Sequence, residues 1–272
     1  GGYLGDSVSP IVMGLLLGGI AFWGLEWSGL DWRLLALILV APALVSAFAV
    51  LVFYGRVTGA EGTRTSQDIV TYLRSARGLL TNSTVMGMVM VNSVQAMAHS
   101  SLNIFLIVYM DEDLGFSEFK IGYHISLLTL LGIPSAPLLG WLSDRIGRRP
   151  VIVVGLGAIA LLVFALVPSG GGLSFTLILA CLGVFLNSLN PVMLATAIDA
   201  VPRGTEASVV ALMFTGPAIF GAISPIIAGR LRELRGMDGV FLFIVVVVAL
   251  VIALSLIVPM RKASEQVSSR SQ

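Results

Sequence analysis

Amide and imidazole side chains recur in one apolar stretch of the chain, at a spacing that places them on one face of a helix. The four side chains follow one another at intervals of three or four residues and are Asn92, Gln95, His99 and Asn103. At about 100° per residue, these positions fall within an arc of about 80°. Amides and a neutral imidazole donate and accept hydrogen bonds without carrying a charge. The stripe therefore suits either recognition of a polar solute or hydrogen bonding between helices.

Asn187 and Asn190 form a second, smaller group of amides, with Pro191 directly after them. A proline leaves the carbonyl four residues earlier without its helical donor, which adds a backbone oxygen to this group. Polar side chains are costly in lipid, so we expect both groups to face a cavity. The alternative is that the amides bond between helices and only fix packing, at about 0.6–2 kcal/mol each.

His99 is the one titratable residue in the middle of a long apolar run. Because imidazole titrates near physiological pH, His99 is a candidate carrier of a coupling proton, with a neutral, hydrogen-bonded core histidine as the alternative. The two histidines are 25 positions apart and there is one cysteine, so we expect no metal site. No Gly-x-Ser-x-Gly, His-Glu-x-x-His or phosphate-loop pattern occurs, and we expect neither enzyme activity nor a cofactor.

The composition indicates where these side chains are held. Of the 272 residues, 57% are hydrophobic and 11% are charged, whereas a soluble domain carries about 25% charged residues. The net charge of +1 gives no field for a nucleic-acid partner. A lipid bilayer is the expected partner, and the expected fold is an all-α integral membrane protein with eight transmembrane helices. The eight apolar runs are Val8–Leu25, Trp32–Phe53, Thr84–Tyr109, Phe119–Trp141, Val151–Val167, Leu173–Ile198, Glu206–Gly229 and Gly239–Pro259.

The distribution of basic residues predicts the orientation. The longest polar stretch runs from Gly55 to Thr81. If it lies in the cytoplasm, alternation of the spans places 11 of the 16 basic residues on the same side. The positive-inside rule then predicts an inner-membrane protein with a cytoplasmic C-terminus.

A motif between the fourth and fifth apolar runs carries a resemblance to a known family. Its glycines suit positions of close backbone approach or positive φ, its arginines can bind carboxylates or lipid phosphates, and Pro150 suits a first helical position. The alternative is a generic basic loop. The string reads Gly140-Trp141-Leu142-Ser143-Asp144-Arg145-Ile146-Gly147-Arg148-Arg149-Pro150. It resembles the signature loop of the major facilitator superfamily, G-x-L-x-D-R-x-G-R-[RK], at every fixed position.

The resemblance covers the whole chain as a fragment corresponding to family helices 5 to 12, without the first four helices. An internal repeat fits this register, because Ser9-Pro10-Ile11-Val12-Met13-Gly14 recurs as Ser224-Pro225-Ile226-Ile227-Ala228-Gly229 with four of six positions identical. The resemblance implies four parts: 1–54 as the last two helices of the N-terminal bundle, 55–81 as the central cytoplasmic loop, 82–260 as the C-terminal six-helix bundle, and 261–272 as a cytoplasmic tail.

The resemblance also implies roles. Helices 7 and 10 of the family line a central cavity, which matches the runs that carry the two amide groups. The signature loop, with Gly140, Asp144, Arg145, Gly147, Arg148 and Arg149, is implied to act as a gate, with Asp144 near the start of helix 5 at Gly5–Ser7. Ser9, Pro10 and Gly14 resemble a degraded form of the glycine-proline motif that drug-efflux members carry in helix 5.

The function expected from the resemblance is secondary active transport of a small organic solute by alternating access, as proton-coupled efflux of a drug or metabolite. One alternative is an uptake symporter for a sugar or an organic acid. The other is a membrane module, or truncated remnant, that transports nothing.

Overall fold

A computed structural model describes most of the chain, in the ranges 9–13, 20–22, 25–27, 32–57, 78–201 and 205–258. Within these ranges the chain is almost entirely helical, which confirms the all-α class. The exception is a pair of three-residue antiparallel strands, β1 (Ile20–Phe22) and β2 (Leu25–Trp27). The expectation of one helix over Val8–Leu25 is therefore wrong at Ile20–Phe22 and at Leu25, while residues 9–13 are helical. Glycines lower helix propensity in this stretch, and its aromatic and β-branched residues favour extended backbone.

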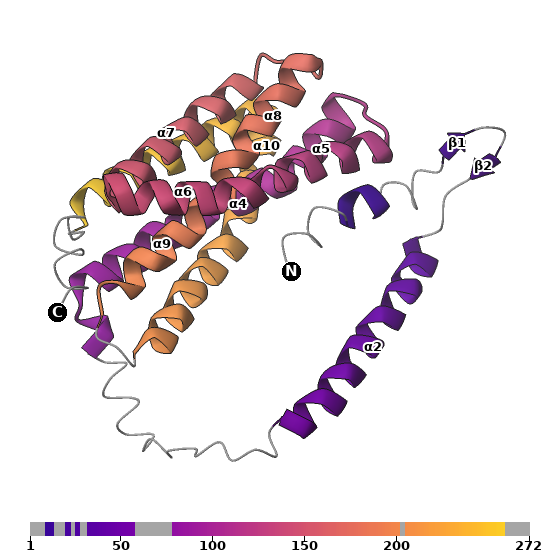
Figure 1. Ribbon diagram of the computed structural model, residues 1–272. Coiled ribbons are helices and arrows are strands. Elements are labelled where there is room, and N and C mark those ends of the chain that lie inside the picture. Colours follow the sequence, from indigo (N-terminus) through magenta and orange to yellow (C-terminus); the bar gives the residue numbers. More distant parts are fainter. Residues whose placement is uncertain are drawn as a thin grey trace.

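Helix α2 (Trp32–Val57) confirms the second expected helix and lies apart from the remaining helices in Figure 1. Its large apolar side chains are exposed: Leu34, Leu37, Val40, Leu44, Val45, Phe48, Val50 and Leu51. A helix that is apolar all round is stable only where lipid or other helices cover it. Its surface is thus suited to a membrane.

Helix α4 (Ser83–Val108) carries the amide stripe and confirms the third expected helix. It begins after Asn82, whose side-chain oxygen accepts hydrogen bonds from the backbone N–H groups of Thr84 at 3.0 Å and Val85 at 3.2 Å. These bonds satisfy two donors that the first turn would otherwise leave open. The helix continues into a π-helical turn, η1 (Tyr109–Asp113).

Two of the expected spans are broken in the middle. The span expected over Phe119–Trp141 consists of α5 (Glu118–Leu130) and α6 (Gly132–Ile146). The span over Leu173–Ile198 consists of α8 (Leu173–Leu186) and α9 (Leu189–Ile198). Each break precedes a proline by three or four residues, at Pro134 and Pro191, because a proline ring removes a helical donor and crowds the carbonyl four residues earlier.

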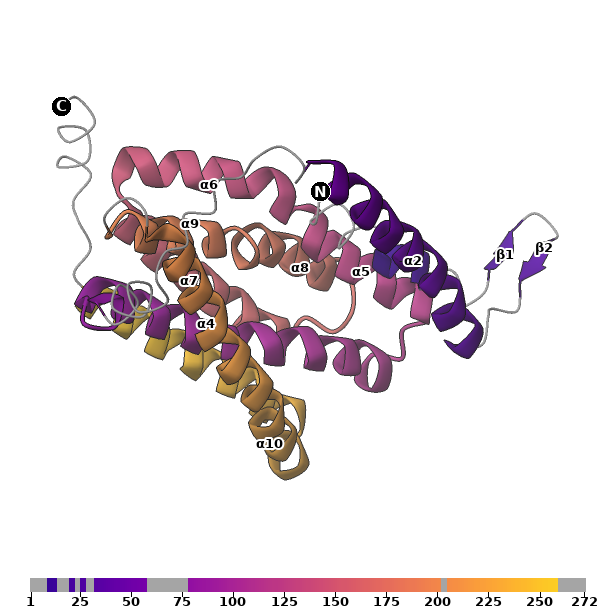
Figure 2. The ribbon, with the colours of Figure 1, turned by 90° about the horizontal axis from the view of Figure 1, so that it is seen from below.

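Helices α7 (Arg148–Leu166) and α10 (Glu206–Ile257) complete the bundle. The two last expected spans form the two arms of α10, which meet at Gly236 with φ 69° and ψ −162°. Helix α10 packs along α4 (Figure 2) and also contacts α7. The buried core gathers side chains of α4, α7, α8, α9 and α10, with Phe175 and Phe241 among the largest fully buried ones.

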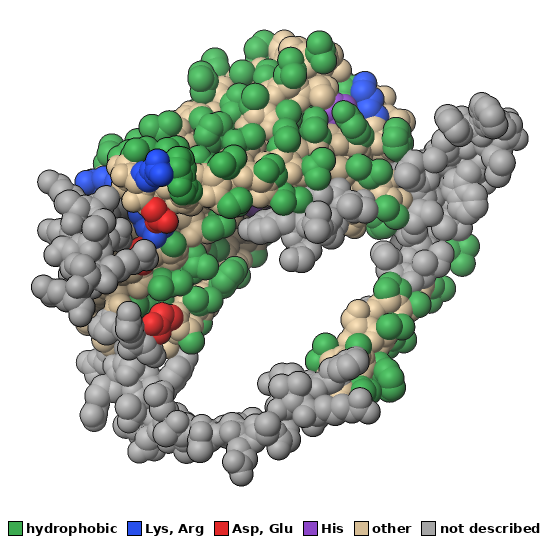
Figure 3. Space-filling model, viewed as in Figure 1, with side chains coloured by type: hydrophobic (Ala, Val, Ile, Leu, Met, Phe, Trp, Pro, Cys, Tyr) green, Lys and Arg blue, Asp and Glu red, His purple; other side chains and the backbone are tan. Residues whose placement is uncertain are grey.

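Four helical stretches among the described residues are long and apolar enough to cross a membrane, rather than the eight expected. They are Glu118–Ile146, Arg148–Leu166, Leu173–Ile198 and Glu206–Ile257. The two arms of α10 count as one stretch, α4 is not among the four, and only the shorter run Val40–Val52 of α2 is apolar enough. The first expected span is described only in short pieces. Hydrophobic side chains cover the visible face of the bundle between its charged ends (Figure 3).

Candidate functional site

A cavity of about 350 Å³ lies where α4, α9 and α10 meet. Four of the six amide and imidazole side chains line it: Asn92, Gln95, His99 and Asn190. The breaks and kinks of the bundle shape this cavity, since Pro191 of α9 and Pro217 of α10 also line it. The stripe on α4 and the amide on α9 thus share one space within the bundle.

Gln95 is the most informative residue of the cavity. Its side chain is buried, with 3% of its surface exposed. Neither its amide nitrogen nor its amide oxygen has a hydrogen-bond partner among the described residues. A buried amide without partners costs about 1–3 kcal/mol, so such groups are rare unless a ligand or water completes them.

The other members of the stripe have partners. Asn92 donates a hydrogen bond to the backbone oxygen of Met213 at 2.8 Å, which ties α4 to α10 while the side chain lines the cavity. Asn103 does not line the cavity, but its nitrogen lies 3.3 Å from Nδ1 and 3.4 Å from Nε2 of His99. Asn103 is thus placed to orient the imidazole.

Asn187 lies outside the set of residues that line the cavity. Its nitrogen donates to the backbone oxygen of Leu128 on α5 at 3.4 Å, and its Cβ lies 2.8 Å from where a Cβ on Gly132 would stand. Its side chain also reaches His99. For this residue the interhelical packing role accounts for most of the contacts.

Apolar side chains make up the remaining wall of the cavity, and the sequence pattern did not predict them. They are Ala96, Leu194, Met213 and Phe214, with the two prolines. Phe214 is 65% exposed despite its size. No local signal separates such a residue from the surrounding apolar run, so only the packing identifies it.

Arg148 holds the centre of the signature loop. One of its terminal nitrogens lies 3.1 Å from Asp144 and 2.8 Å from Asp199, and its side chain is 12% exposed. Asp199 ends α9, so the ion pairs join the α6–α7 turn to the end of a helix that lines the cavity. Gly147 forms that turn with φ 101°, as expected for a position that only glycine adopts without strain.

The other residues of the loop have separate contacts. The Arg145 guanidinium lies 4.0 Å from the centre of the Trp141 ring, and Arg149 donates to the backbone oxygen of Ser255 at 3.3 Å. Gly140 lies inside α6, and a Cβ added there would meet nothing within 4 Å among the described residues. Gly140 therefore has no positive φ, contrary to one of the two roles expected for it, and no close approach among the described residues.

The residues expected in helix 5 are partly described. Ser9 and Pro10 lie in the short helix over 9–13, and Pro10 lines a surface pocket with Ile107 of α4 and Ile121 of α5. Gly14 and the stretch Gly5–Ser7 lie outside the described residues.

Comparison with known proteins identifies the family. The sequence profile described as Major Facilitator Superfamily matches residues 2–179 and 88–272. The chain belongs to this superfamily. Family membership and the apolar helices make it a multi-pass membrane protein.

Three relatives are similar over about half of the chain. A proline/betaine transporter of Salmonella typhimurium is 31% identical over 54% of this chain and 31% of its own length. A proline/betaine transporter of Escherichia coli is 32% identical over 53% of this chain and 30% of its own length. A glycine betaine/proline/ectoine/pipecolic acid transporter of Dickeya dadantii is 31% identical over 54% of this chain and 30% of its own length. These names give no support to the expectation of efflux.

Proposed function

We propose that the chain forms part of a secondary transporter that moves a small solute without net charge across the inner membrane by alternating access. The observation that carries this proposal is the buried, unpartnered amide of Gln95 in a cavity beside Asn92 and His99. A hydrogen-bonding solute would complete that amide while it occupies the cavity. Alternating access follows from the family, in which substrate sites lie between rocking halves.

The lining supports a zwitterion as the solute. Among the described lining residues, none carries a permanent charge, and His99 is the one with an imidazole. An isolated cation or anion would have to lose its water without a counter-charge, which is costly in a low-dielectric space. A zwitterion brings both charges, and its carboxylate can accept hydrogen bonds from amides such as those of Gln95 and Asn190. The relatives are named for solutes of this kind, proline and betaine.

A second candidate is efflux of a lipophilic compound. The apolar wall formed by Leu194, Met213 and Phe214 favours it. Efflux and zwitterion transport differ in the solute that crosses the membrane, so one assay separates them.

His99 is proposed to carry the coupling proton. It lines the cavity, and Asn103 lies close enough to orient its ring. The second histidine, His124, is buried in contact with Thr176 at 3.0 Å and the backbone oxygen of Lys120 at 2.7 Å, outside the cavity. His124 therefore offers a matched control for the loss of an imidazole.

The test is transport in proteoliposomes, with the gene expressed together with its flanking coding sequence. An imposed proton gradient should drive accumulation of labelled glycine betaine or proline and not of tetraphenylphosphonium or glucose. His99→Gln should remove the dependence on the proton gradient, whereas His124→Gln should retain it. Movement of tetraphenylphosphonium alone would establish the efflux candidate, and glucose alone the sugar symporter. No movement of any probe would overturn the transport proposal.

We propose that the signature loop acts as a latch on the cytoplasmic side, through the ion pairs of Arg148 with Asp144 and Asp199. Asp144→Asn should weaken this tie and change the fraction of molecules open to each side. Double electron–electron resonance distances between spin labels on the two halves measure these populations. Unchanged populations and an unchanged transport rate would rule out the latch.

A further inference from the structure

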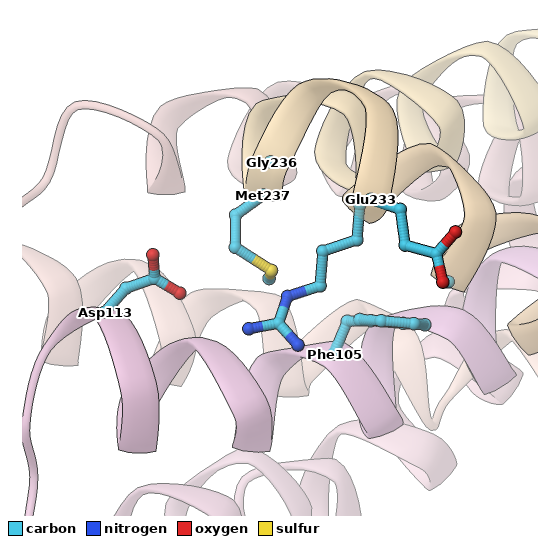
Figure 4. A pocket seen from close by; sticks show the side chains of 7 residues that line it. Phe105, Asp113, Glu233, Gly236 and Met237 are labelled. Atoms are coloured by element: carbon cyan, nitrogen blue, oxygen red, sulfur yellow. The ribbon is translucent and has the colours of Figure 1, made fainter.

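A second pocket lies where α10 kinks, far from the cavity described above. It has a volume of about 560 Å³ and is lined by residues of α4, η1 and α10 (Figure 4). We call it the kink pocket; its lining residues are Phe105, Asp113, Gly229, Arg232, Glu233, Gly236 and Met237. Its volume lies within the range of about 300–1,000 Å³ typical of small-molecule sites.

The kink pocket is at the opposite end of the bundle from the signature loop. At the loop end, Asn82 at the start of α4 donates to the backbone oxygen of Ala200, one residue beyond Asp199. The kink pocket contacts α4 at Phe105 and the turn that follows it at Asp113. The positive-inside rule therefore places this pocket on the outer side of the membrane.

The pocket contains one carboxylate that has no partner and one guanidinium that is only partly used. Asp113 is exposed, and its carboxylate forms no ion pair or hydrogen bond with another described residue. Arg232 pairs with Glu112 through one terminal nitrogen at 2.6 Å, and its side chain remains 29% exposed. Glu233 is paired separately with Arg230. The unpartnered charges that the pocket offers are therefore the Asp113 carboxylate and the remaining donors of Arg232.

Apolar side chains and glycines complete the pocket. Phe105 and Met237 are both 7% exposed and provide apolar surface beneath the charged rim. Figure 4 shows Asp113 and Met237 on facing sides of the pocket. Gly236, at φ 69°, turns the chain between the two arms of α10, and a Cβ there would meet nothing within 4 Å among the described residues.

We propose that the kink pocket is a second binding site, on the outer side, for a small zwitterion. The ligand's carboxylate binds the free donors of Arg232, and its cationic group lies at Asp113. The apolar surface that Phe105 and Met237 give to the same pocket also suits the methyl groups of a methylated ammonium. This inference rests on the proposed substrate class, and it adds a site that loads solute before the central cavity. Phe105 follows Gln95 by ten residues, which places the two sites about 15 Å apart along α4.

A zwitterion fits this charge arrangement better than either single ion. A simple cation would be attracted by Asp113 and repelled by Arg232. A simple anion would be attracted by Arg232 and repelled by Asp113. A ligand with both charges makes two charge-assisted hydrogen-bonding contacts at once. Three probes separate these cases: glycine betaine, choline as the cation, and 3,3-dimethylbutyrate as the anion of the same shape.

The experiment is equilibrium binding of labelled glycine betaine to the full-length protein in lipid nanodiscs, with the two other probes as competitors. Wild type should show two sites. Asp113→Asn should weaken one of them about tenfold, the loss typical of a charged hydrogen-bonding partner. Glu112→Gln is the matched control, because Glu112 pairs with Arg232 but does not line the pocket; this variant should bind at least as tightly as wild type.

Gln95→Leu separates this inference from the proposed function, because it alters the central cavity alone. If each variant removes one site, both proposals stand. If only Asp113→Asn weakens binding, the kink pocket stands and the central cavity does not. If only Gln95→Leu weakens binding, the kink pocket is overturned. Equal competition by choline would overturn the zwitterion, and loss of binding in Glu112→Gln would show that the ion pair, rather than the pocket, matters.

Discussion

At the residue scale, the unpartnered amide of Gln95 lowers the stability of the protein and is proposed to bind the solute. One substitution at this residue therefore tests both effects. Its buried amide lacks partners among the described residues, and that costs about 1–3 kcal/mol. Leucine has a similar volume and no polar atoms, so Gln95→Leu should raise the apparent Tm in detergent and abolish transport. Asn92→Leu should lower the Tm, because Asn92 bonds the Met213 oxygen. Equal destabilisation by both variants would contradict this view of Gln95.

The signature loop allows a second comparison of two residues of one type. Gly147 has φ 101°, where a side chain is strained, whereas Gly140 lies in helix α6 with open space beside it. Gly147→Ala should destabilise the protein by about 1–3 kcal/mol. Gly140→Ala should be neutral or stabilise it by up to about 1 kcal/mol, because alanine favours a helix. Unfolding in denaturant measures both, and equal effects would show that the loop tolerates another conformation.

At the scale of elements, the apolar runs predicted most helices, but the pattern of side-chain spacing failed where a helix breaks. Asn187 and Asn190 share one face only if the helix between them is continuous. The break after Leu186 turns Asn187 toward α5 and leaves Asn190 in the cavity. Pro191 predicts from the sequence that a helical hydrogen bond is lost, but no local rule gives the direction in which the chain then bends. Contacts between helices decide it.

The broken helices pack closely enough to predict a steric effect. A Cβ on Gly183 of α8 would stand 2.1 Å from the backbone oxygen of Leu128 on α5. Gly183→Ala should therefore destabilise the bundle by about 1–3 kcal/mol or more, the cost of overpacking against a backbone that cannot rotate away. Gly157→Ala on α7 is the matched control, since its Cβ would meet nothing within 4 Å among the described residues. Thermal unfolding of the two variants should differ clearly; similar midpoints would mean that α8 can move away from α5.

The whole molecule has an apolar surface suited to lipid and charged ends. The composition predicted the apolar surface, and the distribution of basic residues predicted the orientation. The position of the kink pocket needed the structure, because Glu112 and Arg232 are far apart in the sequence. Their ion pair joins the turn after α4 to the first arm of α10. Arg230, Arg232 and Arg235 lie on the side that the positive-inside rule disfavours, and two of them are paired with carboxylates.

The orientation is the last prediction, and it belongs to the whole molecule. The apolar stretch Glu118–Ile146, formed by α5 and α6, has 29 residues, which at about 1.5 Å per residue exceeds a hydrocarbon core of about 30 Å. Asp111 precedes this stretch and Ile146 ends it, so the two residues should be on opposite sides of the membrane. In a Cys181→Ser background, Asp111→Cys should react with an impermeant maleimide in intact cells. Ile146→Cys should react only after the membrane is permeabilised. The reverse pattern would invert the orientation, and with it the outer position of the kink pocket, while labelling of both from one side would show that the stretch Glu118–Ile146 does not cross the membrane.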